Sequence, residues 1–163
     1  MGFQSTVGLN QAFGVAGEIV SQGPIRSQPF TLVSTPNANV IGNAFSVVSE
    51  GVAKVGGTGD FAGILINPKS YATAGASTGT LDPTLTLPDQ SIGELLSMGE
   101  VLIPVSNSAK VGNRVAYNNT NGALLAIMDS ASSAGAGYTF VPNAKISRYD
   151  LPSAGLGVVT LTN

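Results

Sequence analysis

The sequence predicts an all-β fold: an antiparallel β-sandwich or jelly-roll-like barrel of about ten short strands with an extended N-terminal arm. Three observations predict it. Short apolar and β-branched runs recur along the 163-residue chain, and turn signals separate them about every 8–12 residues. Helical periodicity is nearly absent. An Asn-Gly pair, which is typical of hairpin turns, joins two of the runs at residues 121–122.

The chain is expected to form one β-rich domain, residues 14–163, preceded by an arm, residues 1–13. The first 13 residues alternate small polar and apolar side chains without helical period. Such a segment is expected to become ordered only when it packs against another surface. Strands are then expected at residues 15–20, 28–33 and 39–48. Pro29 restricts the second of these to a sheet edge or to the start of a strand, and Gly42 indicates a bulge in the third.

The most informative stretch couples a glycine cluster, residues 56–59, to a short apolar run, residues 64–66. The glycines permit a tight or left-handed backbone. The run is β-branched at both ends and apolar throughout, as in a strand that is buried on both faces. Pro68 removes a ladder donor and ends the strand. We therefore expect a loop, a central strand and a sharp stop.

Residues 57–62 also match the dinucleotide fingerprint G-x-G-x-x-A, and Asp82 follows about 20 residues later, as that fingerprint requires. The fingerprint places phosphate on the N-terminus of a helix that follows the glycines. Here the glycines lead into a strand-like run that a proline closes. The context therefore favours a turn that feeds a buried strand, and no cofactor is expected.

In the second half of the chain, residues 81–87 alternate cleanly and predict a half-buried strand, at an edge because of Pro83. Residues 89–98 have some helical spacing that Gly93 and Gly99 weaken, so they are expected as a strand or one short helix. The clearest hairpin has arms at residues 111–117 and 123–128. The remaining expected strands lie at residues 101–105, 138–141, 144–147 and 156–161, with loops at 73–79 and 129–137.

Composition points to a protein that works in contact with others. Charged residues make up only 10% of the chain, mean hydropathy is +0.28, and net charge is −2, whereas soluble domains average about 25% charged residues. Apolar and uncharged surface of this kind is usually covered by a partner, by self-assembly or by docking. The seven cations are scattered, which argues against nucleic acid. No apolar stretch approaches the length of a membrane span, and residues 1–6 contain no basic n-region, so no signal peptide is expected.

The chain lacks His and Cys, which excludes the common catalytic triads and thiolate metal sites. Lys69 and Ser70 are adjacent, but neighbours on a strand face opposite ways. The densest acidic group, which could form a glycosidase-like pair, is Asp82, Asp89, Glu94 and Glu100; solvated turn charges are the simpler interpretation. No calcium-loop spacing occurs, so no metal is expected. Four tyrosines are expected as core or interface anchors rather than as a sugar platform: Tyr71, Tyr117, Tyr138 and Tyr149.

Several stretches together resemble the small structural cement proteins of tailed bacteriophages, the capsid decoration class. The most specific is Gly-Asp-Phe-Ala-Gly-Ile-Leu-Ile-Asn-Pro-Lys-Ser-Tyr at residues 59–71. The others are Gly-Val-Ala-Gly-Glu (14–18), Gly-Pro-Ile-Arg (23–26), Val-Ile-Gly-Asn-Ala-Phe (40–45), Leu-Thr-Leu-Pro (85–88), Gly-Asn-Arg-Val-Ala-Tyr (112–117), Val-Pro-Asn-Ala (141–144) and Gly-Leu-Gly-Val-Val-Thr-Leu (155–161). The resemblance covers most of the chain from about residue 14, but not residues 130–137.

The resemblance implies a β-rich domain that oligomerises on the outside of the shell and clamps neighbouring major capsid subunits. The implied partners are the major capsid protein and further copies of the chain, as a homotrimer or homodimer, with no nucleic acid and no membrane. The implied location is the virion capsid surface, after synthesis in the bacterial cytoplasm. Contacts are expected at two segments, the arm and the glycine loop: Phe3, Val7, Leu9 and Phe13, and Gly57, Thr58, Gly59 and Asp60.

Two other classes of function remain open at this stage. A receptor- or glycan-binding head module of a virion fibre or baseplate would also be β-rich, but it would require exposed aromatic side chains that converge with polar groups. A hydrolase would require the thinly spread carboxylates to meet in one cleft. No catalytic residue is assigned.

Overall fold

The computed structural model describes residues 14–21, 23–35, 38–67 and 86–162, and these residues contain strands and turns but no helix. The predicted all-β class is therefore confirmed. The strands are β1 (Arg26–Leu32), β2 (Asn39–Val40), β3 (Ala44–Ser49), β4 (Val52–Val55), β5 (Phe61–Leu65), β6 (Thr86–Leu87), β7 (Ile92–Val105), β8 (Arg114–Asn118), β9 (Leu124–Ile127), β10 (Tyr138–Ser147) and β11 (Gly155–Leu161).

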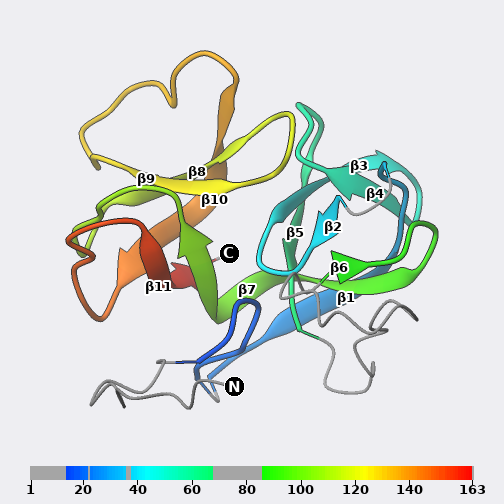
Figure 1. Cartoon of the computed structure of the whole chain (residues 1–163), viewed down its shortest axis with the longest axis horizontal. Helices are drawn as coiled ribbons and strands as arrows, with labels where there is room; N and C mark the ends of the chain where they lie inside the picture. Colours follow the sequence, from blue (N-terminus) through cyan, green and yellow to red (C-terminus); the bar gives the residue numbers. More distant parts are fainter. Residues whose placement is uncertain (1–13, 22, 36–37, 68–85, 163) are drawn as a thin grey trace, which may run out of the picture.

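Two small barrels share one long strand, β7 (Figure 1). The main sheet runs β1-β4-β3-β5-β7-β11-β10-β8-β9, and two further pairings, β1–β7 and β7–β9, close it on each side of β7. We call the ring of β1, β4, β3, β5 and the first half of β7 barrel 1. Barrel 2 is the ring of the second half of β7 with β11, β10, β8 and β9. Strands β2 and β6 form a separate antiparallel pair.

The register shows how β7 serves both barrels. Its first half, from Ile92 to Met98, pairs antiparallel with β1, and Leu95 and Leu96 also pair with β5. Its second half, from Gly99 to Val105, pairs antiparallel with β11. Gly99, with φ of 131°, stands at the change of partner. A 14-residue strand thus carries the pairing that joins the two rings.

The strand β7 corrects one expectation and settles another. Residues 89–98 contain no helix, and residues 101–105 are not a separate strand, because β7 is continuous through both. Leu95 packs in the core of barrel 1, whereas Leu96 packs in the other core cluster. The apolar residues Ile92, Leu95 and Leu96 have the i, i+3, i+4 spacing of a helix. In the structure, Leu95 and Leu96 are both buried because this strand is covered on both faces. Tertiary pairing overrides the weak local signal.

The two barrels have unequal cores. Barrel 1 surrounds a compact cluster of eight buried residues among those described, with Phe45 and Leu95 fully buried in it. Barrel 2 surrounds a larger cluster that includes Tyr117 and Leu124. The larger cluster also takes in Ala44 and Ile64 of barrel 1. The junction between the rings is therefore packed as core rather than as a surface contact.

The hairpin loop between β8 and β9, residues 119–123, ties the barrels together. Ala44 donates its N–H to the Gly122 carbonyl at 2.9 Å, and Gly57 donates to the Asn119 carbonyl at 2.7 Å. A Cβ on Gly122 would lie 2.4 Å from the Ala44 carbonyl oxygen, and Gly122 has φ of 69°. Only glycine permits both this backbone angle and this approach. Next to the loop, the ring of Phe61 in barrel 1 lies 6.1 Å from that of Tyr117 in barrel 2.

Most local predictions hold. The strand at β5 is buried and lies between β3 and β7, as the apolar run predicts, although it begins at Phe61. The hairpin of β8 and β9 is confirmed with its Asn-Gly turn. Residues 28–33 correspond to β1, and 156–161 to β11. Of the strand expected at 81–87, only β6 lies in the described residues; Pro68 and residues 73–79 lie outside them.

Three strand boundaries differ from expectation. Residues 15–20 lie along β7 through backbone bonds such as Gly17 N–H to the Leu102 carbonyl at 2.8 Å, with a single bridge at Ile19. Residues 39–48 are divided between β2 and β3 by a turn, rather than bulged, at Gly42. Residues 138–141 and 144–147 are one strand, β10, whose register shifts at Pro142 and at Asn143, where φ is 48°.

Candidate functional site

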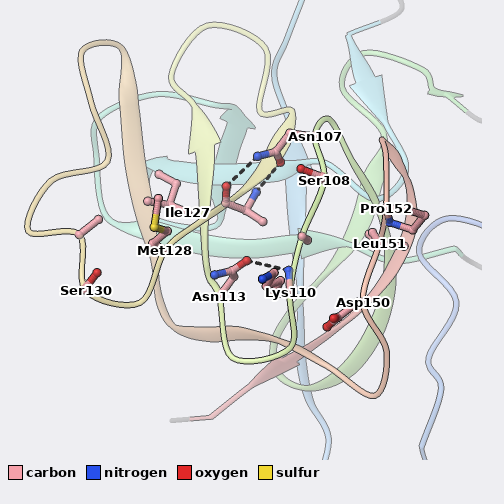
Figure 2. Close-up of a pocket in the computed structure, with 13 residues that line it drawn as sticks. Asn107, Ser108, Lys110, Asn113, Ile127, Met128, Ser130, Asp150, Leu151 and Pro152 are labelled. Atoms are coloured by element: carbon pink, nitrogen blue, oxygen red, sulfur yellow. Dashed lines mark hydrogen bonds between the residues drawn. The ribbon is translucent and has the colours of Figure 1, made fainter.

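An open groove of about 1040 Å³ lies on the outside of barrel 2 (Figure 2). Three segments build it: the connection from β7 to β8, the end of β9 with the residues after it, and the connection from β10 to β11. Its lining residues are Asn107, Ser108, Ala109, Lys110, Asn113, Ala126, Ile127, Met128, Ser130, Ala131, Asp150, Leu151 and Pro152. We call this surface the barrel 2 groove.

A side-chain amide fixes one wall of the groove. Asn107 donates from Nδ2 to the Ala126 carbonyl and accepts the Ala126 N–H on Oδ1, both at 2.9 Å (Figure 2). The amide group thereby occupies the position that a neighbouring strand would take beside β9, where the pairing of β7 with β9 stops at Val105. On the other wall, Ala109 and Leu151 exchange two backbone bonds of 2.9 and 2.7 Å. The groove is therefore preformed.

The groove combines apolar surface with few charged groups. Met128 is 73% exposed beside it, and no aromatic side chain is among the residues that line it. Its charged groups are one cation, Lys110, and one carboxylate, Asp150, which accepts the Val111 N–H at 2.7 Å. Across the described ranges, no three acidic side chains gather as metal ligands would. The groove offers an apolar floor with a few fixed polar groups, as a site for an extended segment or a protruding side chain requires.

The structure describes only some of the residues that were predicted from sequence to make contacts. Phe3, Val7, Leu9 and Phe13 lie outside the described residues. In the glycine loop, Gly57 is buried against the β8–β9 loop, whereas the segment 58–60 is exposed. Gly57 thus fixes the position of the loop through its backbone bond to Asn119. The other three predicted contact residues are accessible to a partner: Thr58, Gly59 and Asp60.

Among the described carboxylates, Glu94 and Glu100 lie too far apart to act as a glycosidase pair. Glu94 and Glu100 are six residues apart on β7, which corresponds to about 20 Å along a strand. A catalytic pair needs a separation of about 5–10 Å. Asp89 accepts the Ser34 N–H at 2.9 Å. Asp82, Lys69 and Ser70 lie outside the described residues.

None of the three described tyrosines lines the groove. Tyr117 is fully buried in the larger core, and burial raises the pKa of its hydroxyl. Tyr149 packs against the same core and donates to the Leu156 carbonyl at 3.2 Å. Tyr138 is partly exposed on β10, and Tyr71 lies outside the described residues. Two of the three described tyrosines are therefore core anchors, as the sequence predicts. No helix in the described ranges is long and apolar enough to cross a bilayer.

Sequence reasoning missed the barrel 2 groove altogether. Its walls come from three turn-rich segments that no shared pattern connects, and the decisive residue, Asn107, looks like any polar turn residue. The exposed Met128 directly after the apolar run of β9 is the one signal that could have pointed to it. By contrast, the glycine loop was found from sequence because glycine clusters constrain the backbone by themselves.

Comparison with known proteins identifies the family. No curated protein matches the chain. Among solved structures, a chain from the capsid of Myoviridae phage XM1 has the same fold, with a TM-score of 0.69, 16% identity, and coverage of 100% of this chain and 99% of that one. A family model described as structural cement protein (E217 gp24/Pam3 gp6) matches residues 3–162. The match spans both barrels and their shared strand, and the chain therefore belongs to the phage structural cement protein family.

Proposed function

We propose that this protein is an oligomeric cement protein that binds the outside of the assembled phage shell and clamps neighbouring major capsid subunits. The observation that carries the proposal is the family match over residues 3–162. In this role the protein acts by binding and not by catalysis. Its partners are the major capsid protein and other copies of itself, as a homotrimer or homodimer, and neither nucleic acid nor a membrane. Its place is the virion surface, after synthesis in the host cytoplasm.

The physical basis of the role is mass action. A protein that binds the assembled shell, and not its separated subunits, stabilises the assembled state in proportion to its occupancy. Many copies acting together need no single tight site, because each linked contact raises the avidity of the next. The low charged fraction of 10% suits broad contact through sheet surfaces and loops.

Three surfaces are assigned to contact with the shell. The arm, through Phe3, Val7, Leu9 and Phe13, adds an extended segment to the exposed sheet edge of a neighbour. The exposed loop of Thr58, Gly59 and Asp60 is held rigid from beneath by Gly57. The barrel 2 groove receives an apolar side chain of the shell beside Met128, whose flexible thioether adapts to irregular surfaces.

We further propose that residues 14–163 form one folding unit with the arm, residues 1–13, outside it. The support is geometric. The strand β7 belongs to both rings, and residues of barrel 1 contribute to the larger core. Separating the rings would expose that core and break the β7 pairings on one side, so neither ring is expected to persist without the other.

Mixing the purified protein with expanded and unexpanded phage shells tests the function. We expect co-sedimentation with expanded shells and a higher shell melting temperature that rises with protein concentration. Absence of co-sedimentation with either kind of shell would contradict the proposal. Turnover of a glycan substrate by the free protein would contradict the non-catalytic role.

A matched pair of substitutions tests the groove. Met128→Asp places a charge on the proposed contact, and we expect shell binding to fall about tenfold, as for the loss of one moderate interface contact. Val15→Asp makes the same chemical change at another exposed apolar position, away from the residues that line the groove, and should leave binding unchanged. Equal effects of the two substitutions would remove the groove from the proposed contact surface.

A further inference from the structure

Charge is divided unevenly between the two barrels among the described residues. Barrel 1 and its connections carry four carboxylates, Glu50, Asp60, Asp89 and Glu94, and two cations, Arg26 and Lys54, for a net charge of −2. Barrel 2, with Glu18 beside the second half of β7, carries four carboxylates and four cations, for a net charge of 0. A net negative barrel and a group of cations gathered on the other barrel favour contact between unlike ends of two copies.

Barrel 2 presents its cations around a hollow of about 470 Å³ on the outer side of β10. We call it the basic hollow. Its lining includes Arg114, Lys145 and Arg148 but no carboxylate. Val111, which is 53% exposed, lies at its edge and supplies an apolar contact.

Two of the three cations of the hollow are held in place by neighbours. Arg114 lies 3.6 Å from the centroid of the Phe140 ring and donates to the Ala131 carbonyl at 3.2 Å. Arg148 donates to Glu100 at 2.5 Å. Within the part of the chain that the structure describes, the Lys145 ammonium forms an ion pair with Asp129 at 3.0 Å, and the two side chains are 55% and 59% exposed. An ion pair this exposed contributes little free energy. Of the three cations of the hollow, Lys145 therefore loses the least free energy when it leaves its present partner to bind another protein.

Barrel 1 presents a complementary surface on the outer side of β1 and β7, which we call the acidic face. Ile92, 61% exposed, and Glu94, also exposed, point outward from β7 two residues apart. The register places Thr31 beside Ile92 and Val52 beside Thr31, so a row of three β-branched side chains crosses three strands, with Ile92 its exposed member.

The turn between β3 and β4 adds a second carboxylate to the acidic face. Thr31 donates its N–H to the Gly51 carbonyl at 2.9 Å, which brings the turn against β1, and the adjacent Glu50 is exposed. The cation of β4, Lys54, leaves this face: its side chain lies beside Ser46 and the backbone of Gly57. The acidic face thus combines the exposed Ile92 with the carboxylates of Glu94 and Glu50, and Arg26 at the start of β1 is its one exposed cation among the described residues.

We propose that the basic hollow of one copy receives the acidic face of a second copy, with Glu94 against Lys145 and Ile92 against Val111. The inference rests on the self-association included in the proposed function and specifies which surfaces make it. A second copy is the occupant because the same chain carries both members of a pair that match in charge and in apolar character. Because the surfaces differ, a two-fold dimer would contain the contact twice, and a ring would contain it once per copy.

Sedimentation of the purified full-length protein, without shells, tests the contact. Wild-type protein is expected to associate, and more weakly at 0.5 M salt than at low salt. Glu94→Lys and Lys145→Glu should each weaken association about tenfold, since each replaces an attraction by a repulsion. The double variant, with both charges exchanged, should recover association to within about threefold of wild type. An equimolar mixture of the two single variants should associate better than either alone.

Lys54→Glu is the matched control, because it makes the same charge change at an exposed cation of barrel 1 outside both surfaces, and it should leave association unchanged. Circular dichroism and melting of each variant check that the fold is intact. A wild-type monomer at all salt concentrations, or a double variant no better than the single ones, would overturn the proposal. Shell binding is scored separately: shells bound by a protein that does not self-associate refute this contact alone, and self-association without shell binding refutes the cement role alone.

Discussion

Barrel 1 and barrel 2 have the same number of strands and share one of them, but they are stabilised differently. Both rings include a short parallel pairing, β1 with β4 and β7 with β9, but barrel 1 has the smaller core. Barrel 2 contains a regular hairpin and the larger core, which extends into β3 and β5 of barrel 1. Barrel 1 therefore depends on its neighbour, because Ala44 and Ile64 of its own strands are buried in the larger core.

A cavity in barrel 1 should have the largest effect on stability. Phe45 is fully buried in the smaller core, so Phe45→Ala should lower the free energy of unfolding by about 4 kcal/mol. If residues 14–163 are one folding unit, protection from hydrogen exchange should fall by the same amount at Ala53 in barrel 1 and at Val159 in barrel 2. Unchanged protection at Val159 would show that barrel 2 folds alone.

The β8–β9 loop should have the next largest effect, because it is the tie between the two rings. In Gly122→Ala, the added Cβ would meet the Ala44 carbonyl at 2.4 Å in a backbone with φ of 69°. We expect a loss of about 3 kcal/mol in chemical denaturation, from strain plus the broken backbone bond. Gly112→Ala is the matched control: φ is 90°, but nothing lies within 4 Å of the added Cβ. It should cost about 1 kcal/mol from strain alone. Equal losses would mean that the loop is not a tie.

Features with a local cause could be predicted from sequence. The hairpin followed from Asn-Gly between two apolar runs, and β5 followed from a glycine cluster ahead of a buried β-branched run. The all-β class followed from the spacing of such runs. Family resemblance could likewise be recognised from short stretches such as residues 59–71, because the glycines and the buried run constrain each other.

Structural features that depend on contacts between residues distant in sequence could not be predicted. Leu96 pairs with Ser27 on one side and Ile64 on the other, and no local pattern specifies either partner. The sharing of β7 by two barrels is therefore invisible in the sequence. The groove depends on Asn107 in the same way, since its amide bonds to Ala126, 19 residues later. Residue type alone does not distinguish this asparagine from a turn asparagine.

Substitution of Asn107 should lower stability less than Gly122→Ala does, and its effect should be confined to barrel 2. Asn107→Ala removes both bonds to Ala126 and should lower the free energy of unfolding by about 2 kcal/mol. Asn107→Asp keeps the acceptor for the Ala126 N–H but sets a carboxylate oxygen against the Ala126 carbonyl oxygen, so it should be at least as destabilising as Asn107→Ala. Amide exchange should accelerate at Ala126 and stay constant at Ala53 of barrel 1. Acceleration at both positions would mean that the amide supports the whole fold and not only the groove wall.

The smallest expected effect is the dependence of the unfolding free energy on pH that one ion pair of barrel 2 produces. The Arg148 hydrogen bond to Glu100 holds the pKa of that carboxyl below its ordinary value of 4.5, with a contribution from Thr160, although partial burial opposes the shift. A carboxyl whose pKa is lower in the folded state adds stability above pH 4.5, and this is lost as the pH falls through the folded pKa.

Because the Arg148–Glu100 pair is partly exposed, its contribution should not exceed about 1 kcal/mol. Arg148→Gln should therefore leave a flatter dependence of unfolding free energy on pH below 4.5 than wild type has. Lys54→Gln, which removes the same charge from barrel 1, should reproduce the wild-type slope. Denaturant titrations at pH 3.5, 4.5 and 6 compare the three proteins. Equal slopes for Arg148→Gln and Lys54→Gln would assign the acid sensitivity to net charge, and would remove one electrostatic difference between the two barrels.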